Sequence, residues 1–513
     1  MRSMSFQWSL NRRAVAIGAA SAIAASRLPG VTVAQEATPE GNDSSSDDQV
    51  VTSDVLLTGL ADPRFVVVDG TDIYFTESGI GGDEPMFVPA DQETPVSQAG
   101  PTGKVSRLAA DGTVTEIASD LMSYTFGAAG EIVGPAGLAL DGEGSVYVAI
   151  GAPGPFVADM PRTGEEGVLV KIDIASGERS VVADLIDWEI TQNPDPMLID
   201  SNPYGMSLVD GIAYIADAGG NTIIAVDVNS GEISTFAVTA GLPADFFGED
   251  GNPGRDGEPE LDSVPSAVEP GPDGRLYVGY VTGGPFPAGY APIDAFSLDG
   301  EMERVVEGLT MTADIAFDSS DRMYVSIVST DLINGGAGQV VRIEEDGATT
   351  IVVDGLALAA GIAFDSDDNL YVINNSSMIP GGGELVRYSG VTNVPASGNT
   401  SSPNIDATPV PDDAANGDGT GGDDSAYHIA FVDMAFEPNA LTIPANIDVT
   451  LTFENMGYLA HDFVIANPKI VSEVLGNGQT SELIVNLPAG EYPFYCAQIG
   501  HRAAGMEGIL TVV

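Results

Sequence analysis

The chain has 513 residues, too many for one ordinary domain, and 43% of them are hydrophobic, enough for more than one core. Its 62 glycines and 33 prolines, with only 7% aromatic residues, favour a turn-rich all-β protein over a helical one. Asp and Glu number 75 against 18 Lys and Arg, a formal net charge of −57. Such a surface repels nucleic acid and anionic lipid, so neither is an expected partner, whereas basic proteins and divalent cations are attracted to it.

The first 34 residues have the pattern of an export signal. Arg12 and Arg13 precede the apolar stretch AVAIGAASAIAAS, and small residues follow it. The arginine pair favours the twin-arginine route, and the general secretory route stays open because the residues after the pair are weakly apolar. We therefore expect an exported protein that is periplasmic, or extracellular and at the cell surface. No later segment approaches the ~18 apolar residues of a membrane helix, so the mature chain is expected to have no membrane span.

Two polar spacers divide the rest of the chain. Residues 35–54 and 391–426 are rich in Gly, Ser, Pro and Asp and lack apolar periodicity. Such segments cannot bury enough apolar surface to fold, so both are predicted to be flexible. The spacers separate a region at 55–390 from one at 427–513.

The larger region repeats six times. Each copy has a short apolar strand, an Asp/Gly turn and a Tyr-containing strand, and in the first five copies a third and a fourth strand follow. The pattern predicts six four-stranded sheets, the arrangement of a six-bladed β-propeller. The sixth copy is one strand short, and the segment DVLLTGL (54–60) is predicted to complete it and close the ring.

Three segments of this region resemble a known family. GPTGKVSRLAADGTVTEIASDL (100–121), EIVGPAGLAL (131–140) and NPYGM (202–206) are similar to NHL-like and SMP-30-like propellers, and within that group to the ScyD/ScyE family. The resemblance implies the propeller fold and little about function.

Residues 427–513 read as a β-sandwich that contains the only cysteine of the chain. An exported protein with one cysteine has no internal disulfide, so a ligand role for Cys496 has to be considered. Four residues separate Cys496 from His501, and four more separate His501 from Met506. His461 opens a predicted strand 35 positions upstream of Cys496. Two imidazoles, one thiolate and a weak axial thioether are the ligands of a blue-copper site.

The motif FxPxxLTIP (436–444) and the ending FYCAQIGHRAAGMEGILTVV resemble azurin, auracyanin and plastocyanin. The resemblance implies a cupredoxin Greek-key β-sandwich with one type 1 copper held by His461, Cys496, His501 and Met506. There is one departure, because cupredoxins often have Asn after the first ligand histidine and this chain has Asp462. A carboxylate cannot donate the same hydrogen bonds, so the potential or the loop rigidity is expected to differ. His428 is expected to be a surface residue.

The propeller has no histidine, because all three histidines lie in 427–513. This excludes the histidine-rich copper cluster of nitrous oxide reductase and argues against a sugar dehydrogenase with a histidine base. A lactonase-like hydrolase stays open. Its metal would take carboxylate and amide ligands at the channel mouth, and the alternative role for such residues is turn hydrogen bonding. The candidates follow Tyr-containing strands: Glu77, Asp217, Asn221, Asn374 and Asn375.

The sequence therefore predicts an exported electron-transfer protein. Its copper domain would move single electrons, and its propeller would dock a basic redox partner of the c-type cytochrome kind, or a small molecule. Insertions at 79–102, 152–166 and 239–262 are expected on one rim and could form that surface. The alternative is a propeller enzyme, either a lactonase-like hydrolase or an oxidoreductase, or an extracellular binding protein, with an accessory copper domain.

Overall fold

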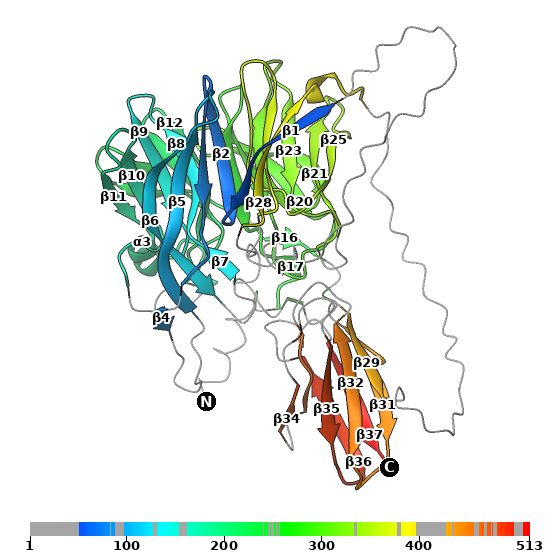
Figure 1. Cartoon of the computed structure of the whole chain (residues 1–513). Helices are drawn as coiled ribbons and strands as arrows, with labels where there is room; N and C mark the ends of the chain where they lie inside the picture. The colour runs from blue at the N-terminus through cyan, green and yellow to red at the C-terminus, as the bar shows by residue number, and fades with distance from the viewer. Residues whose placement is uncertain are drawn as a thin grey trace, which may run out of the picture. The chain divides into compact units, whose positions relative to one another are not determined.

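The structure is a computed structural model of the whole chain, and it separates into two compact units, residues 1–397 and 398–513 (Figure 1). The expected export signal at 1–34, most of the first spacer and most of the linker lie outside the described residues. The described residues are 51–396 and 427–513, without 83, 88–96, 127–130, 153–161, 198, 240, 245–246, 248–250, 253–254, 256, 333–335, 377–380, 433–434, 456–460, 466–468, 473–474, 476–479 and 497–505.

The first unit is a β-propeller, and its first three sheets follow the chain in order. The first sheet has β2 (Pro63–Asp69), β3 (Asp72–Glu77), β5 (Ser97–Leu108) and β6 (Val114–Phe126), with the additional short strands β4 (Glu84–Phe87) and β7 (Glu131–Val133). The second has β8 (Pro135–Leu140), β9 (Ser145–Ile150), β10 (Val168–Asp173) and β11 (Arg179–Asp184). The third has β12 (Pro203–Val209), β13 (Ile212–Asp217), β14 (Thr222–Asp227) and β15 (Ile233–Val238).

The remaining three sheets complete the ring. The fourth has β18 (Pro265–Pro270), β19 (Leu276–Tyr280), β20 (Ala291–Phe296) and β21 (Met302–Leu309). The fifth has β22 (Thr312–Phe317), β23 (Met323–Ile327), β24 (Gly338–Ile343) and β25 (Thr349–Leu356). The sixth has β26 (Ile362–Phe364), β27 (Leu370–Asn374), β28 (Gly383–Ser389) and the N-terminal β1 (Thr52–Leu60). Five sheets therefore have the predicted four strands, and the first is enlarged.

The inner strands close on themselves. β2, β8, β12, β18, β22 and β26 each contact the next, and β26 returns to β2. β1 pairs antiparallel with β28 from Thr52–Ser389 to Leu60–Gly383, so the N-terminal strand completes the last sheet as the repeat predicts. This pairing covers the outer edge of β28, which would otherwise expose unpaired backbone groups. The short 3₁₀ turn Val391–Asn393 contacts β25 of the fifth sheet, and Val391 is fully buried in the core between the fifth and sixth sheets.

The repeated Asp and Tyr of the sequence have one structural role in three sheets. A Tyr hydroxyl of the second strand donates to the Asp of the preceding turn in Tyr277–Asp273, Tyr324–Asp318 and Tyr371–Asp365, at 3.0, 3.0 and 3.1 Å. Each bond fixes the turn against the strand that follows, which explains why the two residue types recur together.

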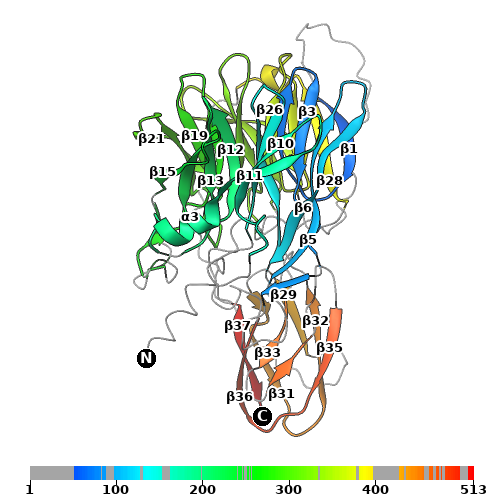
Figure 2. The same cartoon turned by 90° about the vertical axis from the view of Figure 1, so that its left-hand side faces the viewer.

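The insertions lie on one face of the propeller. In an antiparallel four-stranded blade, the second-to-third-strand loops and the connections between blades emerge on the same side. α3 (Leu185–Gln192), β4, β7 and the hairpin β16 (Leu242–Pro243) with β17 (Glu260–Leu261) all belong to such segments. All lie on one side of the propeller in Figure 1, and Figure 2 shows α3 on that side from another direction. α3 is the one α-helix of the described residues and is absent from the sequence-based prediction. No helix of the described residues is long and apolar enough to cross a membrane.

The second unit is a two-sheet β-sandwich. One sheet has the order β30 (Ala435–Glu437), β29 (His428–Val432), β32 (Val449–Asn455), β35 (Thr480–Val485). The other has the order β31 (Ala440–Ile443), β37 (Glu507–Val512), β36 (Gly490–Tyr495), β33 (Val464–Ile465), β34 (Ile470–Val471). Fully buried phenylalanines from both sheets fill the space between them: Phe431, Phe453, Phe463 and Phe494.

Three details of this unit differ from the strands expected from sequence. The stretch 427–436 forms two short strands, β29 and β30, instead of one. β31 and β34 are additional, and His461 forms a single bridge instead of opening a continuous strand. Short strands of two to five residues carry too little apolar alternation to be separated from loops by pattern.

Candidate metal centre

Two of the four proposed ligands are brought together at one end of the β36–β37 pair. Cys496 follows β36 directly, and Met506 precedes β37, the neighbouring antiparallel strand. The Cys496 amide donates to the Met506 carbonyl at 3.1 Å, which extends the ladder by one bond. Both side chains are fully buried. The loop between them therefore starts and ends at a fixed position of the sheet.

His461 reaches the same place from a distant part of the sequence. Its backbone forms a reciprocal bridge with Leu475, with N–O distances of 3.0 and 2.8 Å, and its ring is fully buried. The ring nitrogen Nδ1 lies 3.9 Å from Cys496 Sγ. The structure therefore places a histidine and the single cysteine of the chain side by side across 35 residues of sequence.

This separation fits a shared metal ion. A metal bonded to nitrogen at about 2.0 Å and to sulfur at about 2.3 Å spans an N–S distance of roughly 3.5–4 Å. The thiol and imidazole in contact, and the thioether of Met506 buried in the same core as Cys496, are also the soft and borderline donors that copper prefers. His501, the fourth proposed ligand, lies outside the described residues. Within the described residues no three His, Cys, Asp or Glu side chains form a metal cluster, and Met506 is not of these types.

Asn455, at the end of β32, supports the histidine and was not singled out from the sequence. Its side chain is fully buried, and Nδ2 donates to the Leu475 carbonyl at 2.7 Å. That carbonyl also accepts the His461 amide, so Asn455 holds the residue to which His461 is bridged. The signal available in the sequence was a polar residue at the end of an alternating apolar strand, six positions before the ligand.

The remaining residues of interest in this unit are placed as follows. Asp462, which replaces the usual Asn, is buried next to His461 and is 5% exposed. The Phe431 ring lies edge-on to His461, with 6.3 Å between ring centroids, and contributes to the apolar wall of the site. His428 is exposed on β29, where Nδ1 contacts Thr452 Oγ1 at 3.3 Å, in agreement with its expected surface position.

The propeller residues considered for a lactonase-like site are held in separate local networks. Glu77, Asp217 and Asn374 occupy equivalent ends of second strands, and each accepts a backbone amide just before the first strand of its own sheet, at 2.7, 2.7 and 2.9 Å. Burial raises the pKa of Glu77. Asn375 donates to the Gly382 carbonyl at 2.6 Å, and Asn221 donates to Asp195 at 2.9 Å. These contacts tie each residue to its own blade and favour turn hydrogen bonding over a lactonase-like site at the channel mouth.

Comparison with known proteins supports the reading of the second unit. Residues 414–512 match the family model of the cupredoxin-like domain, which gives the C-terminal unit its class. Among solved structures, dithionite-reduced auracyanin from Roseiflexus castenholzii is 24% identical and covers 17% of this chain and 95% of its own, with a TM-score of 0.16. The curated proteins gave no match.

The propeller is similar to several solved structures at low identity. An inactive virginiamycin B lyase from Staphylococcus aureus, crystallised with quinupristin, is 13% identical and covers 66% of this chain and 98% of its own, with a TM-score of 0.38. Aldose sugar dehydrogenase from Streptomyces coelicolor is 16% identical and covers 47% and 74%, with a TM-score of 0.33. These identities and TM-scores carry no argument, so the propeller fold is assigned from the strand order and the ring closure of the structure itself. The resemblance to the ScyD/ScyE family stays a prediction.

Proposed function

We propose that the protein is an exported single-electron carrier with one type 1 copper held by His461, Cys496, His501 and Met506. The observation that supports this proposal most directly is the 3.9 Å contact between His461 Nδ1 and Cys496 Sγ inside a cupredoxin-like domain. Copper in such a site supplies a one-electron couple, Cu(I)/Cu(II).

The protein fixes the positions of the ligands and keeps water away from them. Cys496 and Met506 are joined through their backbone at the ends of two paired strands, and His461 is fixed by its bridge to Leu475. All three ligand side chains are fully buried. Ligands fixed by a sheet and shielded from water move little when the charge of the site changes, which favours fast electron exchange.

The surface charge supports a basic redox partner, such as a c-type cytochrome. Of the ten arginines in the propeller part of the described chain, all form an ion pair with Asp or Glu: Arg64, Arg107, Arg162, Arg179, Arg255, Arg275, Arg304, Arg322, Arg342 and Arg387. With 75 acidic residues in the chain, most carboxylates remain without a cation. A field of this sign steers basic proteins toward the surface and weakens with added salt.

Colour tests the copper assignment. Full-length protein loaded with one equivalent of copper should be blue from thiolate-to-copper charge transfer and colourless after reduction. His461→Asn and Cys496→Ser should lose the blue band, whereas His428→Asn, the same change at an exposed histidine, should keep it. A colourless wild-type protein with confirmed copper uptake, or a blue Cys496→Ser variant, would overturn the proposal.

A further inference from the structure

Five carboxyl groups are buried together where α3 and its following loop cover the third sheet of the propeller. Their exposed fractions range from 0 to 5%, and they come from α3, from the loop to β12, from the end of β13 and from the segment before β18: Glu189, Asp195, Asp200, Asp217 and Asp262. Burial and the negative charges of Asp217, Asp200 and Asp195 raise the pKa of Glu189 to about 9, and the Asp200 backbone amide hydrogen-bonds its carboxyl group.

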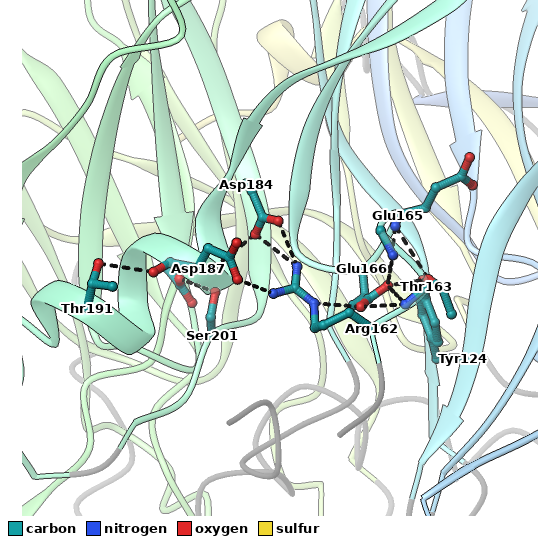
Figure 3. Close-up of polar contacts among 11 residues, drawn as sticks. Tyr124, Arg162, Thr163, Glu165, Glu166, Asp184, Asp187, Thr191 and Ser201 are labelled. Atoms are coloured by element: carbon teal, nitrogen blue, oxygen red, sulfur yellow. Dashed lines mark hydrogen bonds and ion pairs between the residues drawn. The ribbon is translucent and has the colours of Figure 1, made fainter. Parts of the chain in front are cut away.

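The two arginines of this region pair with carboxylates other than Glu189 and Asp217. Arg255 binds Asp262 at 2.7 Å. Arg162 is bound at the start of α3 by Glu166, Asp184 and Asp187, at 2.6, 2.9 and 2.8 Å, as Figure 3 shows. Within the described part of the chain, neither Glu189 nor Asp217 forms an ion pair with Lys or Arg. Buried carboxylates are normally paired with a cation or coordinate a metal, or take up a proton.

Neutral oxygen atoms face the same place. Thr222 lies opposite Asp217 in the β13–β14 pair, so both side chains project from the same face of the sheet. Its hydroxyl is fully buried and has no hydrogen-bond partner, and the same is true of Glu189 Oε2. Gly220 has no side chain to fill the space. A Cβ there would lie 3.2 Å from the Asp200 carbonyl oxygen and 3.3 Å from Thr222 Oγ1.

We propose that this cluster binds one divalent cation of the calcium class beside Gly220. The ligands are the Glu189 and Asp217 carboxylates, the Thr222 hydroxyl and the Asp200 carbonyl oxygen. Carboxylate, hydroxyl and carbonyl oxygens are the donors that calcium takes in proteins, in flexible geometry. Only two carboxylates belong to this set, because Asp195 accepts from Asn221 and Asp262 is paired with Arg255. The ion would tie α3 to the third sheet on the face that carries the insertions.

Trp188 offers a local test, because it precedes Glu189 on α3 and the only other tryptophan is Trp8 in the expected export signal. Mature full-length protein is stripped with a chelator and titrated with Tb³⁺, a luminescent analogue of Ca²⁺, at moderate salt to suppress surface binding. We expect saturable terbium emission sensitised by Trp188, with one ion per chain, that Ca²⁺ displaces. Calorimetric titration with CaCl₂ should give the same stoichiometry.

Matched variants separate this site from the acidic surface. Glu189→Gln and Thr222→Val keep the side-chain volume and should weaken binding at least tenfold, whereas Glu178→Gln, the same change at an exposed position, should leave it unchanged. Two variants are used so that the test still holds if one of them fails to fold. Absence of Trp188-sensitised emission, or equal affinity in wild type and in both folded variants, would overturn the proposal.

Discussion

Asp314 allows a quantitative test of the propeller interior. It lies on the inner strand β22, is 9% exposed and accepts the Ile362 amide at 2.9 Å. Burial raises its pKa to about 7 from the usual 3.8. The folded protein therefore keeps this proton at a pH where the unfolded chain has lost it, so stability must fall as pH rises from about 4 through 7.

The expected size follows from that shift. Each unit of pH between the unfolded and folded pKa costs about 1.4 kcal/mol, so the group should account for roughly 2–3 kcal/mol of lost stability between pH 5 and pH 8. Glu269 adds to this dependence, because burial and the charge of Asp314 raise its pKa to about 8. Asp314→Asn cannot ionise and can still accept the Ile362 amide. Its stability should therefore change less with pH.

Urea unfolding followed by Trp188 fluorescence measures the effect, since the second unit contains no tryptophan. The free energy of unfolding of wild type and Asp314→Asn is compared at pH 5 and pH 8. Asp299→Asn, in the exposed turn between β20 and β21, is the control and should follow wild type. Parallel pH dependence in wild type and Asp314→Asn would refute the reasoning, whatever the absolute stability of the variant.

Three further predictions concern single contacts. Arg64→Met should destabilise the propeller by about 3–5 kcal/mol in urea unfolding, because Asp62 would lose its 2.7 Å partner while staying buried. Asn455→Ala should lower the stability of the second unit by about 1–3 kcal/mol, measured by calorimetry, since the Leu475 carbonyl loses a buried donor. Asp462→Asn should raise the reduction potential of the copper-loaded protein, because a carboxyl group beside His461 is replaced by a neutral amide; an unchanged potential would contradict this.

The sequence alone was sufficient for the repeat and for the ligand spacing. Each copy has an Asp or Gly turn followed by a Tyr-containing strand, as in Asp318 with Tyr324, so the repeat can be read without long-range contacts. The spacing of Cys496 and Met506 is also local, because one loop between neighbouring strands connects them. Closure of the ring by β1 could be predicted because the last copy lacked a strand.

The tertiary structure decided which distant groups meet. His461 reaches Cys496 because β33, which follows it, pairs with the distant strand β36 that ends beside Cys496. Asn455 supports His461 through Leu475, a contact that no spacing reveals. The same holds for Glu189. Its helix was not predicted from the sequence. The raised pKa of its carboxyl group arises only because folding buries it among other acidic side chains. Hydrophobic periodicity in the sequence indicates secondary structure, whereas the burial of a side chain and its distance to other charges are set by tertiary packing.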